Sequence, residues 1–420
     1  MSFKQHSRQY DLVVFGVTGY TGKFVAEHIT THFPTDLKWA IAGRSAAKLQ
    51  NVIDECKALN PDRQSPEIEI CSLNHTELGA LAKKTFAFIT TVGPFSLYGE
   101  YAFKACAEAG THYFDCTGEA VWHSSMIEKY EAVARATGAC LFPQSAMESA
   151  TSDLITFAMA SRIKTEFSAP IGDVIVEVHE IRGAPSGGTL ATVLSLCDAF
   201  HWKEIAKSHV PYNMSPIPNP KKTPKPSLLS KLTGLYPVHN LGLLATSLTS
   251  GTNSAVVHRT WGLFNQEPSL QKQSYGPNFT YREFAKVKNP VRGVVMHYSF
   301  MIGRLLILFC PPFRKMLRKF VSQPGEGPSK EDQAKEYVQF QGLATPDIQL
   351  KTGKQVWAKA EYAGGNYGLT ALLVSQAACT ILQDDIKLPG GVYTPACLGQ
   401  GYVDRTGEAG FKIETMVIDA

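Results

Sequence analysis

The 420-residue sequence lacks the features of several protein classes. Its nine cysteines form no Cys-x-x-Cys pair, which argues against a zinc site and against a disulfide framework. Lys and Arg total 41 and Asp and Glu total 37, so the net charge of +4 is too small to indicate nucleic-acid binding. Hydrophobic residues make up 44% and charged residues 19%, a balance that excludes a disordered chain. We therefore expect a globular protein with no metal site and no nucleic-acid partner. The first strand begins near Asp11, so we expect no signal peptide and a cytoplasmic setting.

Residues 1–150 alternate short apolar segments with helical ones. The apolar segments are residues 12–15, 38–42, 68–71, 86–90, 112–114 and 140–142. Strands and helices in strict alternation predict an α/β fold with a doubly wound parallel sheet, whose strands all end at one edge. We expect this part to be a Rossmann-type dinucleotide-binding domain.

The alternation of short apolar segments with helical ones ends after Thr151. Residues 173–181 and 355–363 alternate polar and apolar side chains, which predicts strands with one open face. Residues 151–365 are therefore expected to form a second, mixed α/β domain, with a basic, Pro-rich insertion. Residues 366–420 begin with an apolar helix, and we expect this C-terminal segment to pack back on the first domain.

The segment 291–320 is apolar, has no acidic residue and carries six Arg and Lys side chains, namely Arg292, Arg304, Arg314, Lys315, Arg318 and Lys319. Arg304 interrupts the apolar run and Pro311 ends it, which disfavours a membrane span. Two alternatives stay open. The segment is either an interfacial helix that contacts lipid through apolar and basic side chains, or a helix buried against the second domain.

A glycine-rich loop, Gly16-Val-Thr-Gly19-Tyr-Thr-Gly22, joins the first strand to the first helix. Gly16 permits the tight turn, Gly19 lets the backbone approach a pyrophosphate, and Gly22 permits close helix packing. The helix N-terminus adds free amides and a positive dipole end. We expect the pyrophosphate to be held by Gly16, Thr18, Gly19, Tyr20, Thr21 and Gly22.

The end of the second strand indicates which cofactor is bound. NAD-binding sheets usually carry an acidic residue there, whereas this chain has Arg44 and Ser45. A guanidinium group bonds a 2′-phosphate, which an acidic side chain would repel. The prediction is NADPH in preference to NAD. Gly93, Pro94 and Phe95 follow the fourth strand and are expected beside the nicotinamide half.

The proton donor is harder to predict. None of the 16 tyrosines has Lys four residues later, which argues against the short-chain reductase mechanism. Asp115 and Glu119, after the fifth strand, are the catalytic candidates, with His123 nearby. The alternative is that both carboxylates only cap a helix and orient the loop. Further candidates follow the sixth strand at Glu148, Ser149 and Asp153, whereas Cys116 and His179 are expected to be structural.

Several of these motifs together resemble one family, the saccharopine dehydrogenase-like oxidoreductases, which include the trans-acting enoyl reductases. They are residues 16–22, 42–44, 93–95, 98–99, 113–119, 186–189, 253–259, 365–368 and 390–395. The resemblance implies a Rossmann domain, a second mixed domain, NAD(P)H-linked reduction and a site lined by residues 113–119. Relatives on lipid droplets favour a peripheral membrane contact by 291–320. Residues 146–153 depart from the family's usual Gly-Phe-Asp-Ser-x-Pro-Ser-Asp.

The leading hypothesis is an NADPH-dependent oxidoreductase that reduces a C=C (enoyl) or related group of an apolar acyl, polyketide or lipid substrate. The basic region 205–266 has no acidic residue and fits an acidic carrier protein that bears the substrate, or is simply a solvated loop. Two alternatives remain. One is a non-catalytic cofactor-binding protein at a lipid droplet or membrane surface, and the other is a saccharopine-type amino acid dehydrogenase. The sequence leaves open whether the chain forms a homo-oligomer.

Overall fold

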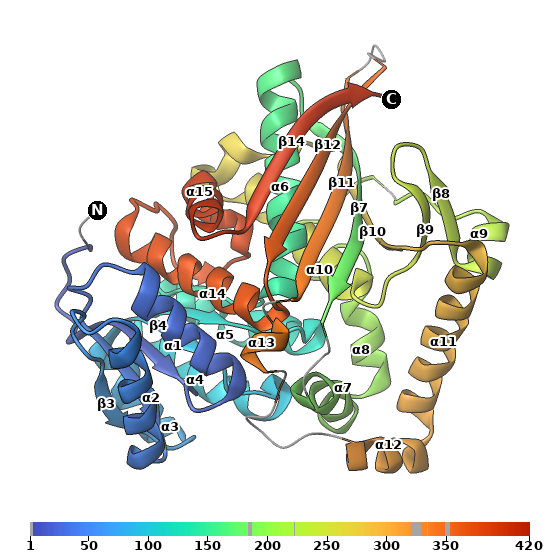
Figure 1. Cartoon of the computed structure of the whole chain (residues 1–420). Helices are drawn as coiled ribbons and strands as arrows, with labels where there is room; N and C mark the ends of the chain where they lie inside the picture. Colours follow the sequence, from blue (N-terminus) through green and yellow to red (C-terminus); the bar gives the residue numbers. More distant parts are fainter. Residues whose placement is uncertain are drawn as a thin grey trace.

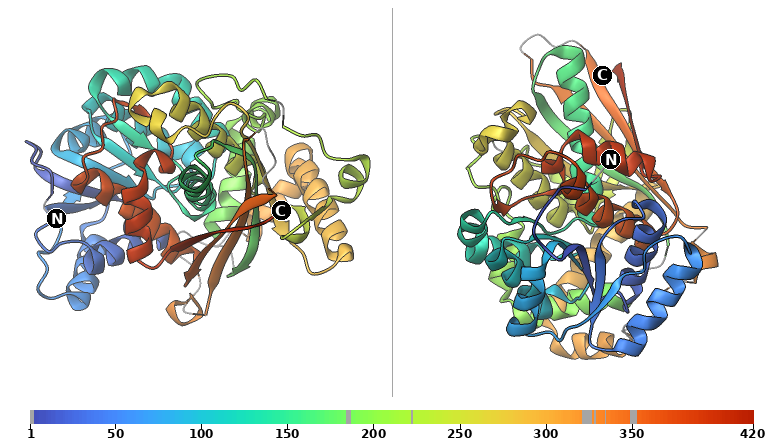
Figure 2. Two further views of the ribbon diagram at one scale, coloured as in Figure 1. Left: turned by 90° about the horizontal axis from the view of Figure 1, so that it is seen from above. Right: turned by 90° about the vertical axis from the view of Figure 1, so that its left-hand side faces the viewer.

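The computed structural model describes residues 3–183, 187–221, 223–320, 327, 329–333, 335–348 and 353–420. These residues form two seven-stranded sheets that lie side by side (Figure 1, Figure 2). Ser186, which belongs to one of the predicted family motifs, lies outside the described residues.

The first sheet is parallel and confirms the predicted Rossmann-type domain. In spatial order its strands are β13 (Gly391–Val392), β6 (Cys140–Phe142), β5 (His112–Asp115), β4 (Thr85–Thr90), β1 (Tyr10–Phe15), β2 (Trp39–Gly43) and β3 (Glu67–Ile70). Its helices are α1 (Tyr20–His32), α2 (Ala46–Leu59), α3 (His75–Lys84), α4 (Phe95–Ala109) and α5 (Ala120–Thr137). The strand order reverses between β1 and β4. In doubly wound sheets, that reversal marks the crevice where a dinucleotide binds.

The second sheet is mixed. Its strands, in spatial order, are β14 (Lys412–Asp419), β12 (Lys354–Ala363), β11 (Tyr337–Pro346), β7 (Ile171–Arg182), β10 (Thr280–Lys286), β9 (Gly242–Thr246) and β8 (Leu235–Val238). Only the β10–β7 pair is parallel among these strands. The predicted strands at 173–181 and 355–363 lie within β7 and β12. The long helices α6 (Met147–Phe167) and α10 (Ser250–Gln266) pack against this sheet and lie between it and the first sheet (Figure 1).

The remaining helices lie around the two sheets. They are α7 (Gly187–Ala199), α8 (Trp202–Ser208), α9 (Leu228–Thr233), α11 (Pro290–Phe309), α12 (Pro311–Leu317), α13 (Lys330–Gln333), α14 (Asn366–Gln383) and α15 (Gln400–Glu408). Three short 3₁₀ segments are η1 (Pro268–Gln273), η2 (Arg318–Phe320) and η3 (Pro395–Leu398).

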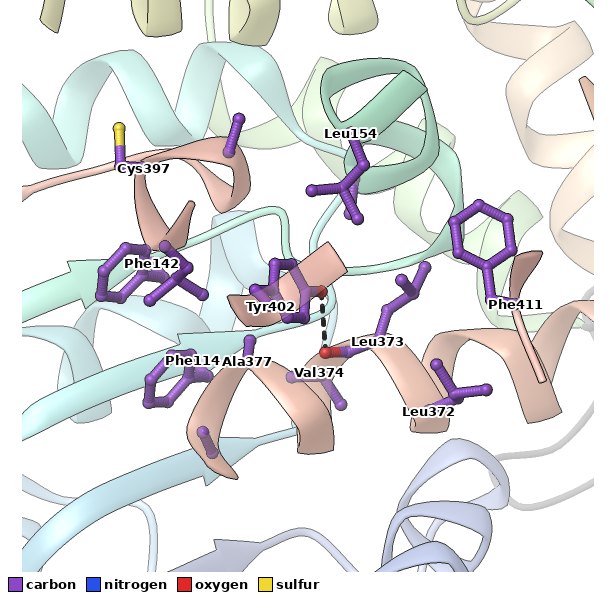
Figure 3. Close-up of a cluster of buried hydrophobic side chains, with 14 of the residues drawn as sticks. Phe114, Phe142, Leu154, Leu372, Leu373, Val374, Ala377, Cys397, Tyr402 and Phe411 are labelled. Carbon is purple, nitrogen blue, oxygen red and sulfur yellow. Dashed lines mark hydrogen bonds between the residues drawn. The ribbon is translucent and has the colours of Figure 1, made fainter. Parts of the chain in front are cut away.

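The C-terminal segment joins both halves of the molecule. Helix α14 is buried over most of its length and packs against α1, β4 and β5. In Figure 3 its side chains meet Phe114 and Phe142 of the first sheet and Leu154 of α6, and the Tyr402 hydroxyl donates to the Leu373 carbonyl at 2.9 Å. The segment does not pack on the first domain alone, because the whole of β14 pairs with residues 354–361 of β12.

Helix α11 is exposed at the outer edge of the second domain (Figure 1). It is the one helix among the described residues that is long and apolar enough to cross a membrane, and only 6% of its most apolar window is buried. The alternative of a helix buried against the second domain is therefore wrong. Gly293 is its buried residue, and only the helix's first half rests on the sheet, near Leu235 and Ala245.

Candidate active site

The glycine-rich loop between β1 and α1 is tightly packed at two of its three glycines. Gly16 has φ +97°, and a Cβ there would stand 2.7 Å from Val92 Cγ2. A Cβ at Gly22 would stand 2.3 Å from the Gly16 carbonyl oxygen. Both positions therefore require glycine, the first for its conformation and the second because the helix approaches the loop itself. At Gly19, by contrast, an added Cβ would meet only the Gly16 oxygen, at 3.3 Å.

The N-terminus of α1 is open to a ligand. Gly19 is its N-cap residue, and no side chain caps the helix. The amides of the first turn thus lack an intrahelical partner, an arrangement that suits phosphate. Thr18 and Thr21 are partly exposed beside them. These residues fit the pyrophosphate of a dinucleotide.

Tyr20 has a second role that the sequence did not reveal. Its hydroxyl accepts a hydrogen bond from Gln333, and its ring packs edge-on against Tyr367 at a centroid distance of 4.9 Å. Gln333 lies in α13 and Tyr367 at the start of α14, so residues distant in sequence close over one side of the phosphate loop.

The ribose position carries an exposed cation. Arg44 directly follows β2 and is exposed, and no ion pair holds it among the described residues. Ser45 caps α2, since its Oγ accepts from the Lys48 amide at 3.4 Å, and its hydroxyl hydrogen is still available to donate. Both side chains fit a 2′-phosphate.

The loop after β4 is anchored by Glu119. Its carboxylate accepts hydrogen bonds from the amides of Phe95 (2.7 Å) and Ser96 (2.8 Å), the first residues of α4. Glu119 is fully buried, and burial raises its pKa, which these two bonds partly counteract. The side chain thus fixes the Gly93-Pro94-Phe95 turn at the carboxyl edge of the sheet.

Asp115 organises the neighbouring loops. Its Oδ1 accepts from the amides of Thr117 (3.0 Å) and Gln144 (2.9 Å), and its Oδ2 accepts from the Tyr113 hydroxyl at 2.8 Å. It is fully buried, and burial raises its pKa to about 7. These contacts agree with the alternative in which Asp115 and Glu119 orient the loop. A catalytic role for either residue stays a prediction.

Glu148 differs from both carboxylates. It lies in the first turn of α6, is partly exposed, and accepts no hydrogen bond from the described residues. Its Oε2 lies against Gly118, where an added Cβ would be 2.6 Å away. Burial, together with the charge of Glu283, raises its pKa to about 7. Glu148 therefore combines access with a proton that is available near neutral pH.

The other sequence candidates have structural partners. Asp153 is fully buried and accepts from Thr260 Oγ1 (2.6 Å) and the Ala396 amide (2.8 Å), which ties α6 to α10 and η3. The Nδ1 atom of His179 lies 2.7 Å from Glu177 Oε1. Burial raises the pKa of the Cys116 thiol, so it is not a thiolate at neutral pH.

A chain of buried polar side chains runs from this edge into the second domain. His123 Nδ1 lies 2.5 Å from Gln144 Oε1, and Gln144 Nε2 donates to Ser149 Oγ at 3.3 Å. Ser149 donates to Asn253 Oδ1 at 3.1 Å, and Asn253 Nδ2 donates to Glu283 Oε2 at 2.8 Å. These hydrogen bonds thus connect Ser149, the residue next to Glu148, with Glu283.

Glu283 lies in the wall of a cavity of about 420 Å³. Most of its lining comes from residues 209–258, within the region that has no acidic residue, and includes Val210, Pro226 and Ala255. The volume is in the range of small-molecule sites. In the sequence Asn253 stands out only within a family motif, and nothing in the strand pattern around Glu283 marks that residue as functional.

Comparison with known proteins adds to this geometry. Residues 12–141 match the family model described as the saccharopine dehydrogenase NADP binding domain. A Mycobacterium tuberculosis protein provisionally named a trans-acting enoyl reductase is 29% identical over 426 residues, covering 97% of this chain and 98% of its own. The trans-acting enoyl reductase of Mycobacterium leprae is 27% identical over 433 residues, with the same coverage.

Two solved structures share the fold over nearly the whole chain. The saccharopine dehydrogenase (L-Glu forming) of Saccharomyces cerevisiae has a TM-score of 0.54 at 10% identity, covering 97% of this chain and 100% of its own. The homospermidine synthase of Legionella pneumophila, solved with NAD, has a TM-score of 0.52 at 12% identity, covering 98% and 92%. At such identities these likenesses concern the fold alone.

Proposed function

We propose that the chain is an NADPH-dependent reductase of the C=C bond in apolar enoyl thioesters, since it carries a match to the saccharopine dehydrogenase NADP binding domain and is similar over nearly its whole length to trans-acting enoyl reductases. The observation that carries the proposal is Glu148, a partly exposed carboxyl with a pKa of about 7, at the edge of a sheet whose phosphate loop fits a dinucleotide. The names of the mycobacterial relatives support the enoyl substrate.

Each part of the site has a role in this reaction. NADPH supplies the hydride when bound. The loop 16–22 would hold its pyrophosphate, Arg44 and Ser45 its 2′-phosphate, and Glu119 would keep the turn at Gly93–Phe95 in place beside the nicotinamide. Reduction of C=C needs one hydride at the β-carbon and one proton at the α-carbon, and Glu148 would donate that proton.

The 420 Å³ cavity is the proposed acyl site. Its lining combines apolar side chains with Lys225 and Arg282, and Glu283 joins it to the Glu148 loop through Asn253. The cations at the cavity would favour a thioester delivered on an acidic carrier or a phosphopantetheine arm.

The test is an assay of NADPH oxidation with long-chain 2-enoyl thioesters, in which the saturated thioester is identified as product. We expect one saturated product per NADPH consumed. If the protein binds NADPH but converts no enoyl thioester, the non-catalytic alternative takes precedence. Oxidation that requires an amino acid and a keto acid instead would favour the saccharopine-type alternative.

A further inference from the structure

An apolar stripe runs along the solvent side of α11. Val291, Val295, Tyr298, Ile302, Leu305 and Phe309 recur at intervals of three or four residues, and the exposed fraction of each is between 40% and 72%. This spacing places all six on one helical face. An amphipathic helix normally turns such a face towards the core, but here it is turned outward, whereas Gly293 faces the sheet.

Helix α9 extends the stripe. Its Leu228, Leu229 and Leu232 are 74%, 71% and 58% exposed. The Tyr298 hydroxyl donates to the Leu232 carbonyl at 3.0 Å, which holds the two helices together. At the other end, Phe309 meets the ring of Trp202, itself 44% exposed, at a centroid distance of 6.0 Å. We call these side chains of α9, α11 and Trp202 the apolar edge.

The charge around the apolar edge is mainly positive, although Glu204 follows Trp202 by two residues and Asp198 pairs with Arg318. No acidic residue occurs in 205–266 or 284–325, whereas both segments carry Lys and Arg. Lys231, Arg292, Arg304, Lys315 and Lys319 are exposed, and no ion pair holds any of them among the described residues. An apolar surface beside unneutralised cations fits a partner that is apolar inside and anionic outside.

From this arrangement we infer that the apolar edge is a docking surface for an anionic lipid membrane, with α11 lying in the plane of one leaflet. The inference does not depend on the proposed reductase activity. Helix α11 keeps its contacts with β8, β9 and α9, so it lies on the bilayer rather than crossing it. A helix of this length is about 30 Å long, enough for an extended contact on a flat surface.

Charge decides between a membrane and a second copy of this chain. Two apolar edges facing each other would bring together two sets of unneutralised cations, which costs free energy at close range. Anionic lipid headgroups would instead neutralise them while the stripe enters the acyl boundary. A true span is disfavoured because Arg304 would lie within the hydrocarbon.

The experiment is vesicle flotation of the whole protein with phosphatidylcholine alone and with phosphatidylserine added. We expect flotation with the anionic vesicles, weakening as sodium chloride is raised. Ile302→Glu/Leu305→Glu should lower the partition coefficient at least about tenfold, because two exposed apolar side chains become charged. Lys315→Ser/Lys319→Ser should also weaken binding and reduce its salt dependence.

The matched control is Leu59→Glu, an equally exposed leucine (47%) at the end of α2. It should float like the unaltered protein, and unchanged melting temperatures should show that every variant is folded. The inference is wrong if the unaltered protein does not float, or if Ile302→Glu/Leu305→Glu floats as well as Leu59→Glu. If the protein does not float but sediments as a dimer that this double variant dissociates, the apolar edge is a protein interface.

Discussion

The carboxyl group of Glu148 lies directly against Gly118, so that a Cβ added at Gly118 would stand 2.6 Å from Glu148 Oε2. Gly118 follows Thr117, whose amide is held by Asp115, and precedes Glu119, which is held by the first amides of α4. The loop is thus fixed on both sides, and its lack of a side chain leaves room for the Glu148 carboxyl.

Gly118→Ala should therefore push the Glu148 carboxyl aside and lower turnover, while NADPH binding stays close to normal. The control is Gly79→Ala in α3, where an added Cβ meets nothing within 4 Å. Steady-state rates and cofactor fluorescence titrations measure the two effects. Equal turnover in the two variants would mean that the position of Glu148 does not matter.

Glu148→Gln should lower kcat by about 100-fold or more, because an amide cannot donate the proton that general-acid catalysis requires. The pH profile gives a sharper test. Burial raises the pKa of Glu148 to about 7, and only the protonated form donates, so kcat should fall as the pH rises through about 7. The residual rate of Glu148→Gln should show no such fall. If that fall persists in the variant, another group is the donor.

Arg44→Asp should reverse the cofactor preference. The substitution removes a bidentate donor to the 2′-phosphate and adds repulsion, so NADPH should bind about 100-fold more weakly, whereas NADH should bind at least as well. Parallel fluorescence titrations with both cofactors measure the change. Equal affinity of the unaltered protein for NADPH and NADH would already contradict a role for Arg44.

Gly19→Ala and Gly22→Ala should have different effects. At Gly22 the new Cβ would be 2.3 Å from the Gly16 oxygen, so the loop must deform and the melting temperature should fall together with NADPH binding. At Gly19 the protein itself accommodates the Cβ, so the melting temperature should hold while NADPH binding weakens. A Gly19→Ala variant with full affinity would show that no pyrophosphate approaches this backbone.

Arg259 connects three elements and should matter for stability alone. Its guanidinium donates to the carbonyls of Met214 (2.7 Å) and Val392 (2.6 Å) and pairs with Glu131 at 2.9 Å, and it is 2% exposed. Arg259→Met takes the guanidinium donor from the Met214 and Val392 carbonyls, while Glu131 keeps its bonds from Arg135 and the Val392 amide, and the substitution should cost about 3 kcal/mol of unfolding free energy. The exposed pair Lys129–Glu100 supplies the control, since Lys129→Met should cost less than about 1 kcal/mol. Urea denaturation measures both.

The first sheet could be predicted from sequence because most of its strands are buried on both faces and end at recognisable turns, with β3 at the sheet edge as the partly exposed exception. The predicted strand at 140–142 coincides with β6, and the family resemblance carried by the glycine loop is confirmed. Strand β13 was missed because two residues, Gly391 and Val392, carry no periodic pattern.

The site was harder to predict, because the sequence shows which residues meet at an edge but not which carboxyl is already hydrogen-bonded. Asp115, Glu119 and Glu148 all follow strands and look alike in the sequence. Their difference arises from the amides of Thr117, Phe95 and their neighbours, which donate to the first two carboxylates, whereas no described residue donates a hydrogen bond to Glu148. The exposure of the apolar face of α11 could not be predicted either, because an apolar stripe in a sequence does not show whether that face of the helix packs on the core or faces solvent.

Strand β13 has a consequence for biosynthesis. The outermost strand of the cofactor-binding sheet comes from residues 391–392, and α14, which covers its face, comes from 366–383. The ribosome must therefore synthesise nearly the entire polypeptide before the cofactor-binding domain can be complete. A chain that terminates between residues 150 and 365 would contain the whole glycine loop but would lack α14 and β13, so the side of β4 and β5 that α14 covers would stay exposed.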